Sequence, residues 1–216
     1  MRKSLPRILV TAGPTREYLD PTRFISNPSS GKMGYLIAEE AWRLGCSVLL
    51  ISGPTSLKPL PVKTLHVVSA REMFKVLQAN FRDCDVLMMT AAVSDFRPKS
   101  YSPHKIKKEG CSRIVELISN PDILAWAGNH KGKKMLVGFA AQTERLFENA
   151  REKMLGKNLD LIVANCVGFQ DRGFEANKIE FLILEPSTMK VPTRLWTKKK
   201  LAKYLVRKMI TFFSEK

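Results

Sequence analysis

Cysteine and histidine are scarce in this 216-residue chain, and neither is clustered. Zinc and redox sites usually carry cysteines in C-x-x-C pairs, and that spacing is absent. The sequence therefore argues against a structural zinc, a dithiol redox centre and a histidine-based metal site, and we interpret the cysteines as buried, reduced thiols. The residues concerned are Cys46, Cys84, Cys111, Cys166, His66, His104 and His130.

Long apolar segments are also missing. The longest runs, such as Val86–Met89 and Leu161–Ala164, are far shorter than the roughly 20 residues needed to span a bilayer. The N-terminal residues 1–7 lead at once into a strand-like segment, which leaves no space for the apolar region of a signal peptide. We expect a cytoplasmic protein with no membrane partner.

Two glycine-rich nucleotide motifs are absent as well. Gly13 is followed by Pro-Thr, which does not match the dinucleotide fingerprint, and the segment ending at Lys32 lacks the first glycine of a Walker A loop. Two Tyr-x-x-x-Lys matches, Tyr101–Lys105 and Tyr204–Lys208, could suggest a nicotinamide-dependent reductase. Pro103 breaks the helical spacing of the first, and the second has no serine partner upstream. We interpret both as chance matches.

Positive charge is abundant: 36 lysine and arginine residues against 20 acidic ones give a formal net charge of +16. Such a charge attracts polyanions, including nucleic acid and phosphorylated small molecules. A basic nucleic-acid module is the alternative, but the aromatic residues mostly fall in apolar segments rather than between basic ones. We expect no specific nucleic-acid partner. The two basic groups are a loop (Lys99, Lys105, Lys107, Lys108) and a predicted solvated helix face (Arg194, Lys198, Lys199, Lys200, Lys203, Arg207, Lys208).

Apolar runs alternate with helical periodicity along most of the chain. Continuous apolar strands separated by helices indicate a parallel sheet that is covered on both faces. The fold class we predict is α/β, a doubly wound Rossmann-like and mostly parallel sheet in one domain over residues 1–216. The predicted strands are Arg7–Ala12, Val48–Ser52, Leu65–Val68, Asp85–Thr90, Met135–Ala140 and Leu161–Ala164, and the helices between them are Met33–Leu44, Ala70–Ala79 and Thr143–Leu155.

The pattern changes after residue 165. Lys178–Leu184 alternates like a half-exposed strand, and a turn over Pro186–Pro192 leads into another short strand. Thr197 can cap a closing amphipathic helix that extends to Phe213.

Two long loops follow predicted strand ends, Gly13–Lys32 and Ala91–Glu109. Ligands of open α/β sheets bind beyond the carboxyl ends of strands, so both loops are candidate binding elements. The first ends in a Ser-rich helix start, where backbone N–H groups favour a phosphate, although a plain helix cap explains it equally well. In the second, Asp95 and the lysines after it suit a metal–triphosphate complex; the alternative is a flexible basic loop.

Taken together, these segments resemble phosphopantothenate–cysteine ligase (phosphopantothenoylcysteine synthetase), and the motifs stand in the family's order. The resemblance covers roughly residues 7–185. The motifs are Thr11–Thr15, Asp20-Pro21, Arg23, Ser26-Asn27, Ser29–Gly34, Ala91–Val93, Asp95, Lys105–Lys108, Asn120–Asp122, Gly138–Ala141, Lys157, Asp160 and Asn165. In most bacteria this ligase is fused behind a flavin-dependent decarboxylase, which is absent from the sequence, so the resemblance implies a stand-alone form and no flavin.

The resemblance implies a two-step, Mg²⁺-dependent ligation of L-cysteine to 4'-phosphopantothenate with CTP as co-substrate, by a homodimer in which parts of one subunit close the other's site. Lys105–Lys108 has the bacterial, CTP-using form rather than the ATP-using eukaryotic one. Gln142 stands where the family usually has Glu.

Matching positions imply roles for individual residues. Asn27 and Lys105 correspond to the catalytic pair, and Asp95 to the metal or nucleotide contact. The CTP-binding positions implied are Ser29, Ser30, Gly31, Met89, Thr90, Ala91, Asp95, Lys105, Pro121, Asp122, Ile123, Leu124, Phe139, Lys153 and Lys157.

Overall fold

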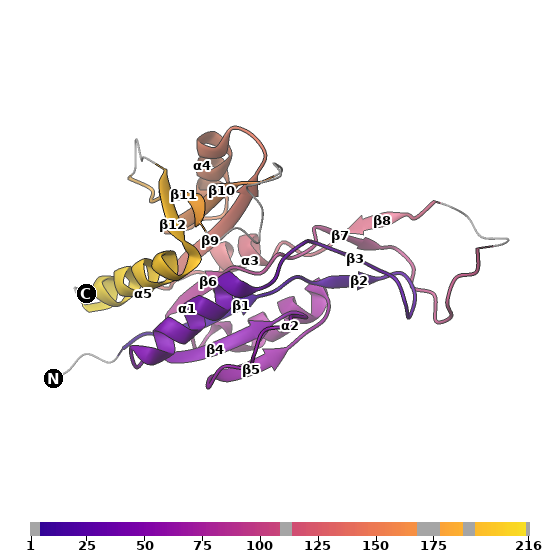
Figure 1. The fold of residues 1–216 in the computed structure, drawn as a ribbon, viewed down its shortest axis with the longest axis horizontal. Coiled ribbons are helices and arrows are strands. Elements are labelled where there is room, and N and C mark those ends of the chain that lie inside the picture. Colours follow the sequence, from indigo (N-terminus) through magenta and orange to yellow (C-terminus); the bar gives the residue numbers. More distant parts are fainter. Residues whose placement is uncertain (1–4, 109–113, 168–177, 188–192, 215–216) are drawn as a thin grey trace.

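The computed structural model describes residues 5–108, 114–167, 178–187 and 193–214. Its centre is an eight-stranded sheet with the strand order β12-β11-β10-β9-β6-β1-β4-β5, in which β10 through β5 are parallel and β11 and β12 pair antiparallel (Figure 1). The strands are β1 (Arg7–Ala12), β4 (Ser47–Ser52), β5 (Lys63–His66), β6 (Val86–Met89), β9 (Met135–Gln142), β10 (Leu161–Cys166), β11 (Lys178–Leu184) and β12 (Arg194–Thr197).

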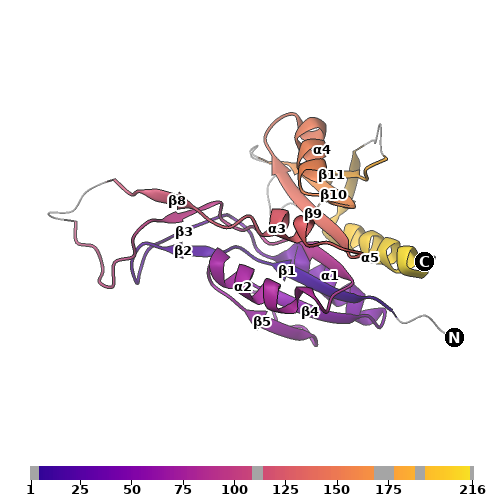
Figure 2. The ribbon, with the colours of Figure 1, turned by 180° about the vertical axis from the view of Figure 1, so that it is seen from behind.

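Helices cover both faces of this sheet, as Figures 1 and 2 show from opposite sides. One core lies under α1 and α5 and contains Ile37 and Leu205, and the other lies under α2, α3 and α4 and contains Met73 and Met154. The predicted doubly wound α/β fold is thus confirmed. The helices are α1 (Lys32–Arg43), α2 (Ala70–Phe81), α3 (Ile123–Asn129), α4 (Leu146–Gly156) and α5 (Lys198–Ser214).

The alternating direction of side chains along each strand explains why there are two cores. In β1, Ile8 and Val10 face the α1–α5 side, whereas Leu9 faces the α2–α4 side, and all three are buried. Successive side chains of a strand point to opposite faces, so a strand that is covered on both faces must be apolar throughout. This is why the apolar runs predicted the strands well.

Some helix boundaries differ from the sequence-based prediction for identifiable reasons. The fourth helix begins at Leu146 rather than Thr143, because Arg145 adopts a left-handed conformation (φ 46°) that a right-handed helix cannot include. The closing helix begins as expected: Thr197 Oγ1 accepts a hydrogen bond from Lys200 N at 3.1 Å. At the start of α2, Ser69 Oγ caps the helix by accepting from Glu72 N at 3.2 Å, and the Glu72 carboxylate accepts from Val68 N at 2.8 Å.

An elongated extension leaves the body of the protein beyond the carboxyl edge of the sheet (Figure 1). We call it the arm; it comprises residues 16–26 and 96–119, of which 109–113 are not described. It contains two antiparallel pairs, β2 (Arg16–Tyr18) with β3 (Phe24–Ser26), and β7 (Phe96–Pro98) with β8 (Leu117–Ser119). The sequence predicted only loops here, because three-residue strands are too short to show periodicity.

The thiols of the described residues agree with the interpretation from sequence. Cys46 and Cys84 are buried, Cys166 is half-buried, and none of the three forms a disulfide. Burial raises the pKa of the Cys84 thiol to about 11, so it stays protonated and unreactive at neutral pH. Cys111 lies outside the described residues.

Candidate active site

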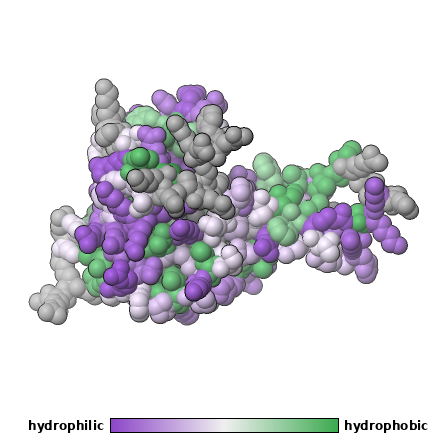
Figure 3. Space-filling view, in the orientation of Figure 1, coloured by the Kyte–Doolittle hydropathy of each residue, from purple (hydrophilic) through white to green (hydrophobic). Residues whose placement is uncertain are grey.

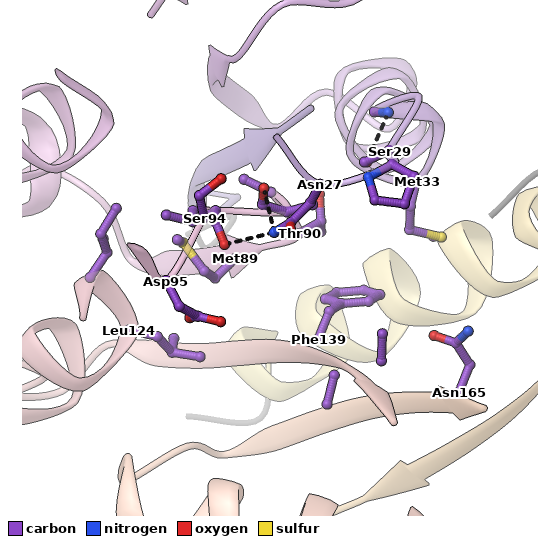
Figure 4. Close-up of a pocket in the computed structure, with 18 of the residues that line it drawn as sticks. Asn27, Ser29, Met33, Met89, Thr90, Ser94, Asp95, Leu124, Phe139 and Asn165 are labelled. Atoms are coloured by element: carbon purple, nitrogen blue, oxygen red, sulfur yellow. Dashed lines mark hydrogen bonds between the residues drawn. The ribbon is translucent and has the colours of Figure 1, made fainter. Parts of the chain in front are cut away.

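A cavity of about 630 Å³ opens at the carboxyl ends of β6, β9 and β10, beside the start of α1. This is where an open α/β sheet is expected to bind its ligand, and the volume suits a nucleotide-sized molecule. Figure 4 shows how Asn27, Asp95 and Phe139, which come from three separate parts of the chain, border the same space.

The start of α1 forms one wall of the cavity. Gly31 is the N-cap residue in a left-handed conformation (φ 75°) and provides no side chain to cap the helix. Ser29 and Ser30 bend the loop through their hydroxyls, which accept hydrogen bonds from Gly31 N (3.3 Å) and Lys32 N (3.4 Å). Because Gly31 provides no cap and Ser30 Oγ satisfies only Lys32 N, the remaining N–H groups at the start of α1 and the positive end of its dipole can bind an anion from the cavity.

Two glycines allow this wall to approach the strands closely. A Cβ atom on Gly31 would lie 2.8 Å from Thr55 Cγ2, and one on Gly34 would lie 2.5 Å from Thr90 Oγ1 and 2.6 Å from Ala12 Cβ. Such distances are shorter than real Cβ contacts, so α1 can pack in this position only with glycine there. The motif ending in Gly34 therefore places the helix start directly against the end of β6.

The segment after β6 forms the adjoining wall. Thr90 Oγ1 donates to Thr11 O at 2.6 Å, and Ala91 N donates to Thr11 Oγ1 at 3.2 Å. Asn27 Nδ2 donates to Val93 O at 3.0 Å and more weakly to Ala92 O at 3.4 Å. The Asn27 bonds add to a backbone link between the two long loops, in which Ala92 N donates to Gly13 O at 2.9 Å within an isolated parallel β-bridge between Pro14 and Ala92.

The opposite wall carries three charged side chains. Lys157 Nζ lies 2.7 Å from Asp122 Oδ2, and Asp122 also caps α3 by accepting from Ala125 N at 2.9 Å. Burial alone would raise the pKa of the Asp122 carboxyl, but the hydrogen bonds from Lys157 and Ala125 N and the charges of Lys157 and Lys153 lower it overall. The Asp122 carboxylate is therefore already paired within the protein, with Lys157 and with Ala125 N.

Of the three charged side chains in this wall, Lys153 is the one that forms no ion pair within the described part of the chain. Its ammonium donates to Phe139 O at 3.4 Å. Burial and the nearby charge of Lys157 lower its pKa, and the more distant Asp122 and Asp95 only partly oppose them. An incoming anion would relieve this electrostatic strain, so Lys153 and Lys157 are candidate phosphate ligands.

Asp95 is the carboxylate of the cavity that remains available. It is exposed, and within the described part of the chain its carboxylate accepts no hydrogen bond and forms no ion pair. No cluster of three or more His, Cys, Asp or Glu side chains that could hold a metal occurs among the described residues. Mg²⁺ commonly binds through one or two carboxylates together with substrate phosphates and water, so Asp95 fits that mode rather than an all-protein site.

Two residues between the walls were not predicted as binding residues. Asn120 joins the two chain segments by donating from Nδ2 to Ser94 O (2.9 Å) and from its backbone N to Asp95 O (2.8 Å). Ser94 is 4% exposed, and its hydroxyl is, among the described residues, the buried side-chain polar atom that lacks a hydrogen-bond partner. Its position in the cavity wall shows where a ligand or water can satisfy it.

The structure thus brings together nearly all of the site residues predicted from sequence. Asn27, Ser29, Ser30, Gly31, Met89, Thr90, Ala91, Asp95, Pro121, Asp122, Ile123, Leu124, Phe139, Lys153 and Lys157 all line the cavity. Lining residues that the sequence analysis did not select include Lys32, Asn165 and Lys198. Lys32 and Asn165 stand in motifs of the resemblance, and Asn165 also follows a predicted strand end, but neither was assigned a binding role. Lys198 is distant in sequence and carried no local signal.

Lys105 is the predicted residue that does not line this cavity. It is exposed and lies in the arm, where its neighbour Ile106 is anchored: Ile106 N donates to Asp20 Oδ2 at 3.1 Å, and Arg23 donates to Ile106 O. Asp20 is fully buried and also accepts from Thr22 N and Arg23 N, both at 2.8 Å. The Asp20…Arg23 motif therefore holds the Lys105 loop in the arm.

Gln142, which departs from the family pattern, does not border the cavity either. Its Oε1 accepts a long hydrogen bond from Asn149 Nδ2 at 3.4 Å, at the end of β9. The departure therefore has no direct contact through which to alter the cavity.

The fold and this cavity define a class: a doubly wound α/β protein whose candidate active site lies at the carboxyl edge of its sheet. Within that class, the chain belongs to the family of the DNA/pantothenate metabolism flavoprotein C-terminal domain, whose family model matches residues 4–212. The resemblance found in the sequence is confirmed at the level of this family.

Named relatives are consistent with that assignment. The chain is 46% identical over 172 residues to the coenzyme A biosynthesis bifunctional protein CoaBC of Bacillus subtilis (strain 168), covering 79% of the chain and 42% of the relative. It is 41% identical to the Escherichia coli (strain K12) CoaBC over 215 residues, covering 97% of the chain and 52% of the relative. The chain thus spans about half the length of these relatives.

A solved structure matches the chain almost from end to end. The crystal structure of the C-terminal domain of a coenzyme A biosynthesis bifunctional protein CoaBC superposes with a TM-score of 0.78 at 38% identity, covering 99% of this chain and 98% of that one. No helix in the described part of the chain has the length and apolar character required to cross a membrane.

Proposed function

We propose that the protein is a phosphopantothenate–cysteine ligase of coenzyme A biosynthesis, which joins L-cysteine to 4'-phosphopantothenate at the expense of CTP and with Mg²⁺ in the cytoplasm. The observation that carries the proposal is the single cavity that combines an uncapped helix N-terminus, a lysine pair and a free carboxylate. Family membership and the CoaBC relatives support it.

The reaction requires activation because a carboxylate is a poor electrophile. In the first step a carboxylate oxygen of phosphopantothenate attacks the α-phosphorus of CTP, and pyrophosphate leaves. In the second step the amine of cysteine attacks the acyl carbon of the acyl-cytidylate, CMP leaves, and an amide forms with loss of one proton. Both steps need groups that hold phosphate charge in place.

The residues of the cavity can divide this task. Lys153 and Lys157 bind and neutralise phosphate oxygens. Asp95 would hold Mg²⁺, which would supply further positive charge to the phosphate oxygens. The start of α1 binds a further anionic group, and Phe139 and Leu124 exclude water from the apolar side. Asn27 is already oriented by its bonds to the second loop, and its Oδ1 can accept a hydrogen bond from the pantothenate moiety.

Nucleotide preference is the first test. Pyrophosphate release, measured with CTP and with ATP at equal concentration, should be faster with CTP and should require Mg²⁺. Equal or faster turnover with ATP would overturn the CTP assignment and leave the ligase assignment intact. Absence of cysteine-dependent product with every nucleotide would overturn the ligase assignment itself.

The second test separates the two half-reactions. Lys105→Gln removes a full positive charge and should slow pyrophosphate release on the order of 10²–10³-fold. Asn27→Asp introduces a negative charge that repels the phosphorylated substrate, so the acyl-cytidylate should form but be discharged slowly by cysteine. Rapid-quench analysis with labelled CTP checks both. Accumulation of intermediate in Lys105→Gln, or its absence in Asn27→Asp, contradicts this division.

The homodimer is part of the proposal, because Lys105 lies in the arm rather than in the cavity of its own chain. Apolar side chains along the arm are exposed, with Tyr101 at 57% and Leu117 at 44%, and Figure 3 shows them gathered on the extension. A second copy that covers this surface would place its own Lys105 near the cavity of the first. Sedimentation that shows only a 24.4 kDa species at micromolar concentration would refute the dimer.

Subunit mixing tests whether Lys105 acts across the dimer. Chains carrying Lys105→Gln are mixed with chains carrying Asn27→Asp, each nearly inactive alone. In a mixed dimer one site then combines an intact Asn27 with the intact Lys105 of the partner, so about a quarter of wild-type activity should return after random exchange. No recovery, despite subunit exchange shown by sedimentation of tagged chains, would mean that Lys105 acts within its own chain.

A further inference from the structure

A second cavity, of about 890 Å³, lies at the opposite edge of the sheet from the candidate active site. It is bordered by the start of β9 (Met135), by Asp160 just before β10, by residues 185–187 after β11, and by α5 with β12. We infer that this cavity binds a soluble small molecule that carries two or more phosphate groups on a partly apolar body.

The charge of the lining is strongly positive and mostly uncompensated. Its two acidic residues are already paired, Glu185 with Lys208 at 2.7 Å and Asp160 with Lys131 at 2.7 Å. The four further cations of the lining form no ion pair within the described part of the chain. They are Arg194, Lys200, Lys203 and Arg207.

Three of these cations occupy one face of α5. Lys200, Lys203 and Arg207 are spaced by three and four residues, which places them next to one another on the helix surface. Like charges at this spacing destabilise a helix, so their arrangement works against the stability of the isolated fold. A polyanion in the cavity would convert that repulsion into attraction.

Aromatic rings hold two of the cations without neutralising them. The Arg194 guanidinium lies 5.1 Å from the centroid of the Trp196 ring and 5.7 Å from that of Tyr204, and Lys200 Nζ lies 5.1 Å from that of Trp196. Cation–π contacts fix the direction of a side chain but leave its full charge. A carboxylate in the same place would have cancelled the charge, so the geometry is suited to an external anion.

The same contacts argue against nucleic acid. Single-stranded nucleic acid binds on open aromatic faces, on which bases stack in succession. The Trp196 ring is covered by Arg194 and Lys200 and meets Tyr204 edge-on, with centroids 5.2 Å apart. The site is also a hollow rather than a continuous strip, and its volume suits one small molecule. A single phosphate would leave most of it unfilled, including the apolar part near Phe212.

Isothermal titration with two probes tests the inference. Inorganic tripolyphosphate supplies charge alone, and adenosine 3',5'-bisphosphate supplies two phosphates on an aromatic body. We expect one bisphosphate per chain at this cavity, bound more tightly than tripolyphosphate. In Lys203→Gln/Arg207→Gln the affinity should fall about tenfold or more, because two charge-assisted hydrogen bonds are lost.

A matched control separates a site from general charge. Arg71→Gln/Lys75→Gln removes the same two charges at the same spacing from the exposed face of α2, and should leave affinity unchanged. Lys157→Gln, in the candidate active site, should also retain this binding event. Equal weakening in both double variants, or loss in Lys157→Gln, overturns the inference. So does tighter binding of a single-stranded oligonucleotide or of anionic vesicles, when that binding depends on Lys203 and Arg207.

Discussion

Replacing Gly34 with alanine tests whether the candidate active site depends on close packing of α1 against the strands. In most helices this change stabilises a protein by up to about 1 kcal/mol, because glycine is the poorer helix former. Here the new Cβ atom would lie 2.5 Å from Thr90 Oγ1 and 2.6 Å from Ala12 Cβ. Ala12 is fully buried in β1, and Thr90, just after β6, is held by the hydrogen bond that its hydroxyl donates to Thr11 O, so neither neighbour moves freely.

The expected magnitude follows from these two opposing terms. Overpacking of a tight interior costs about 1–3 kcal/mol, which exceeds the helix-propensity gain. Gly34→Ala should therefore lose up to about 2 kcal/mol of unfolding free energy, and for a chain of this size each 1 kcal/mol shifts Tm by about 2–4 °C. The start of α1 must also move away from Thr90, and a displacement of about 1 Å in a site can cost roughly 10²-fold in rate.

Gly156→Ala is the matched control. Gly156 is the last residue of α4, its φ is not positive, and a Cβ atom there would meet nothing within 4 Å. Urea unfolding followed by circular dichroism should show Gly34→Ala less stable and Gly156→Ala as stable as wild type or more so. Pyrophosphate release should fall only in Gly34→Ala. A Gly34→Ala protein more stable than wild type, or one with unchanged kinetics, refutes the packing argument.

Three further outcomes are expected. Lys153 has a lowered pKa and should bind phosphate only when it is charged. As the pH rises, nucleotide affinity should therefore decline at a lower pH than the one at which an ordinary lysine loses its proton. Lys153→Gln should remove that dependence from a profile of KM against pH. Ser94→Ala removes a hydroxyl without a partner, so its thermal midpoint should not fall, whereas Ser52→Ala, which loses bonds to Tyr35 and Gly53, should melt lower. Asp20→Asn should weaken the anchoring of the Lys105 loop and reduce pyrophosphate release with little change in KM for CTP; a rise in KM alone would contradict this.

The sequence predicted the central fold because the relevant signal is local. Strands buried on both faces read as apolar runs, as in all of β6 and in Ile8, Leu9 and Val10 of β1, and the helices between them carry clear periodicity. The end of α4 and the start of α5 were also predictable from Gly156 and Thr197, each of which acts within one turn.

The candidate site was predictable to the extent that its residues sit in motifs or follow strand ends. Asn27 and Asp95 belong to the two long loops, which the structure joins by the Asn27 amide and by a single β-bridge between Pro14 and Ala92, too short to leave a pattern in the sequence. Lys198 was missed because only the return of the closing helix across the sheet brings it to the cavity. The strands of the arm were missed because each has only three residues, too few to show periodicity, and the two halves of the arm are held together by contacts between segments far apart in the chain, as in the bond from Ser102 N to Leu19 O.

The closing helix α5 runs from the candidate active site to the second cavity. It has 17 residues, about 25 Å of helix, and contains no glycine or proline at which it could bend. Its first residue, Lys198, borders the candidate active site, and its basic face borders the second cavity. Any coupling between the two cavities through this helix would be reciprocal: a ligand at the basic face and a substrate beside Lys198 would change each other's affinity by the same factor.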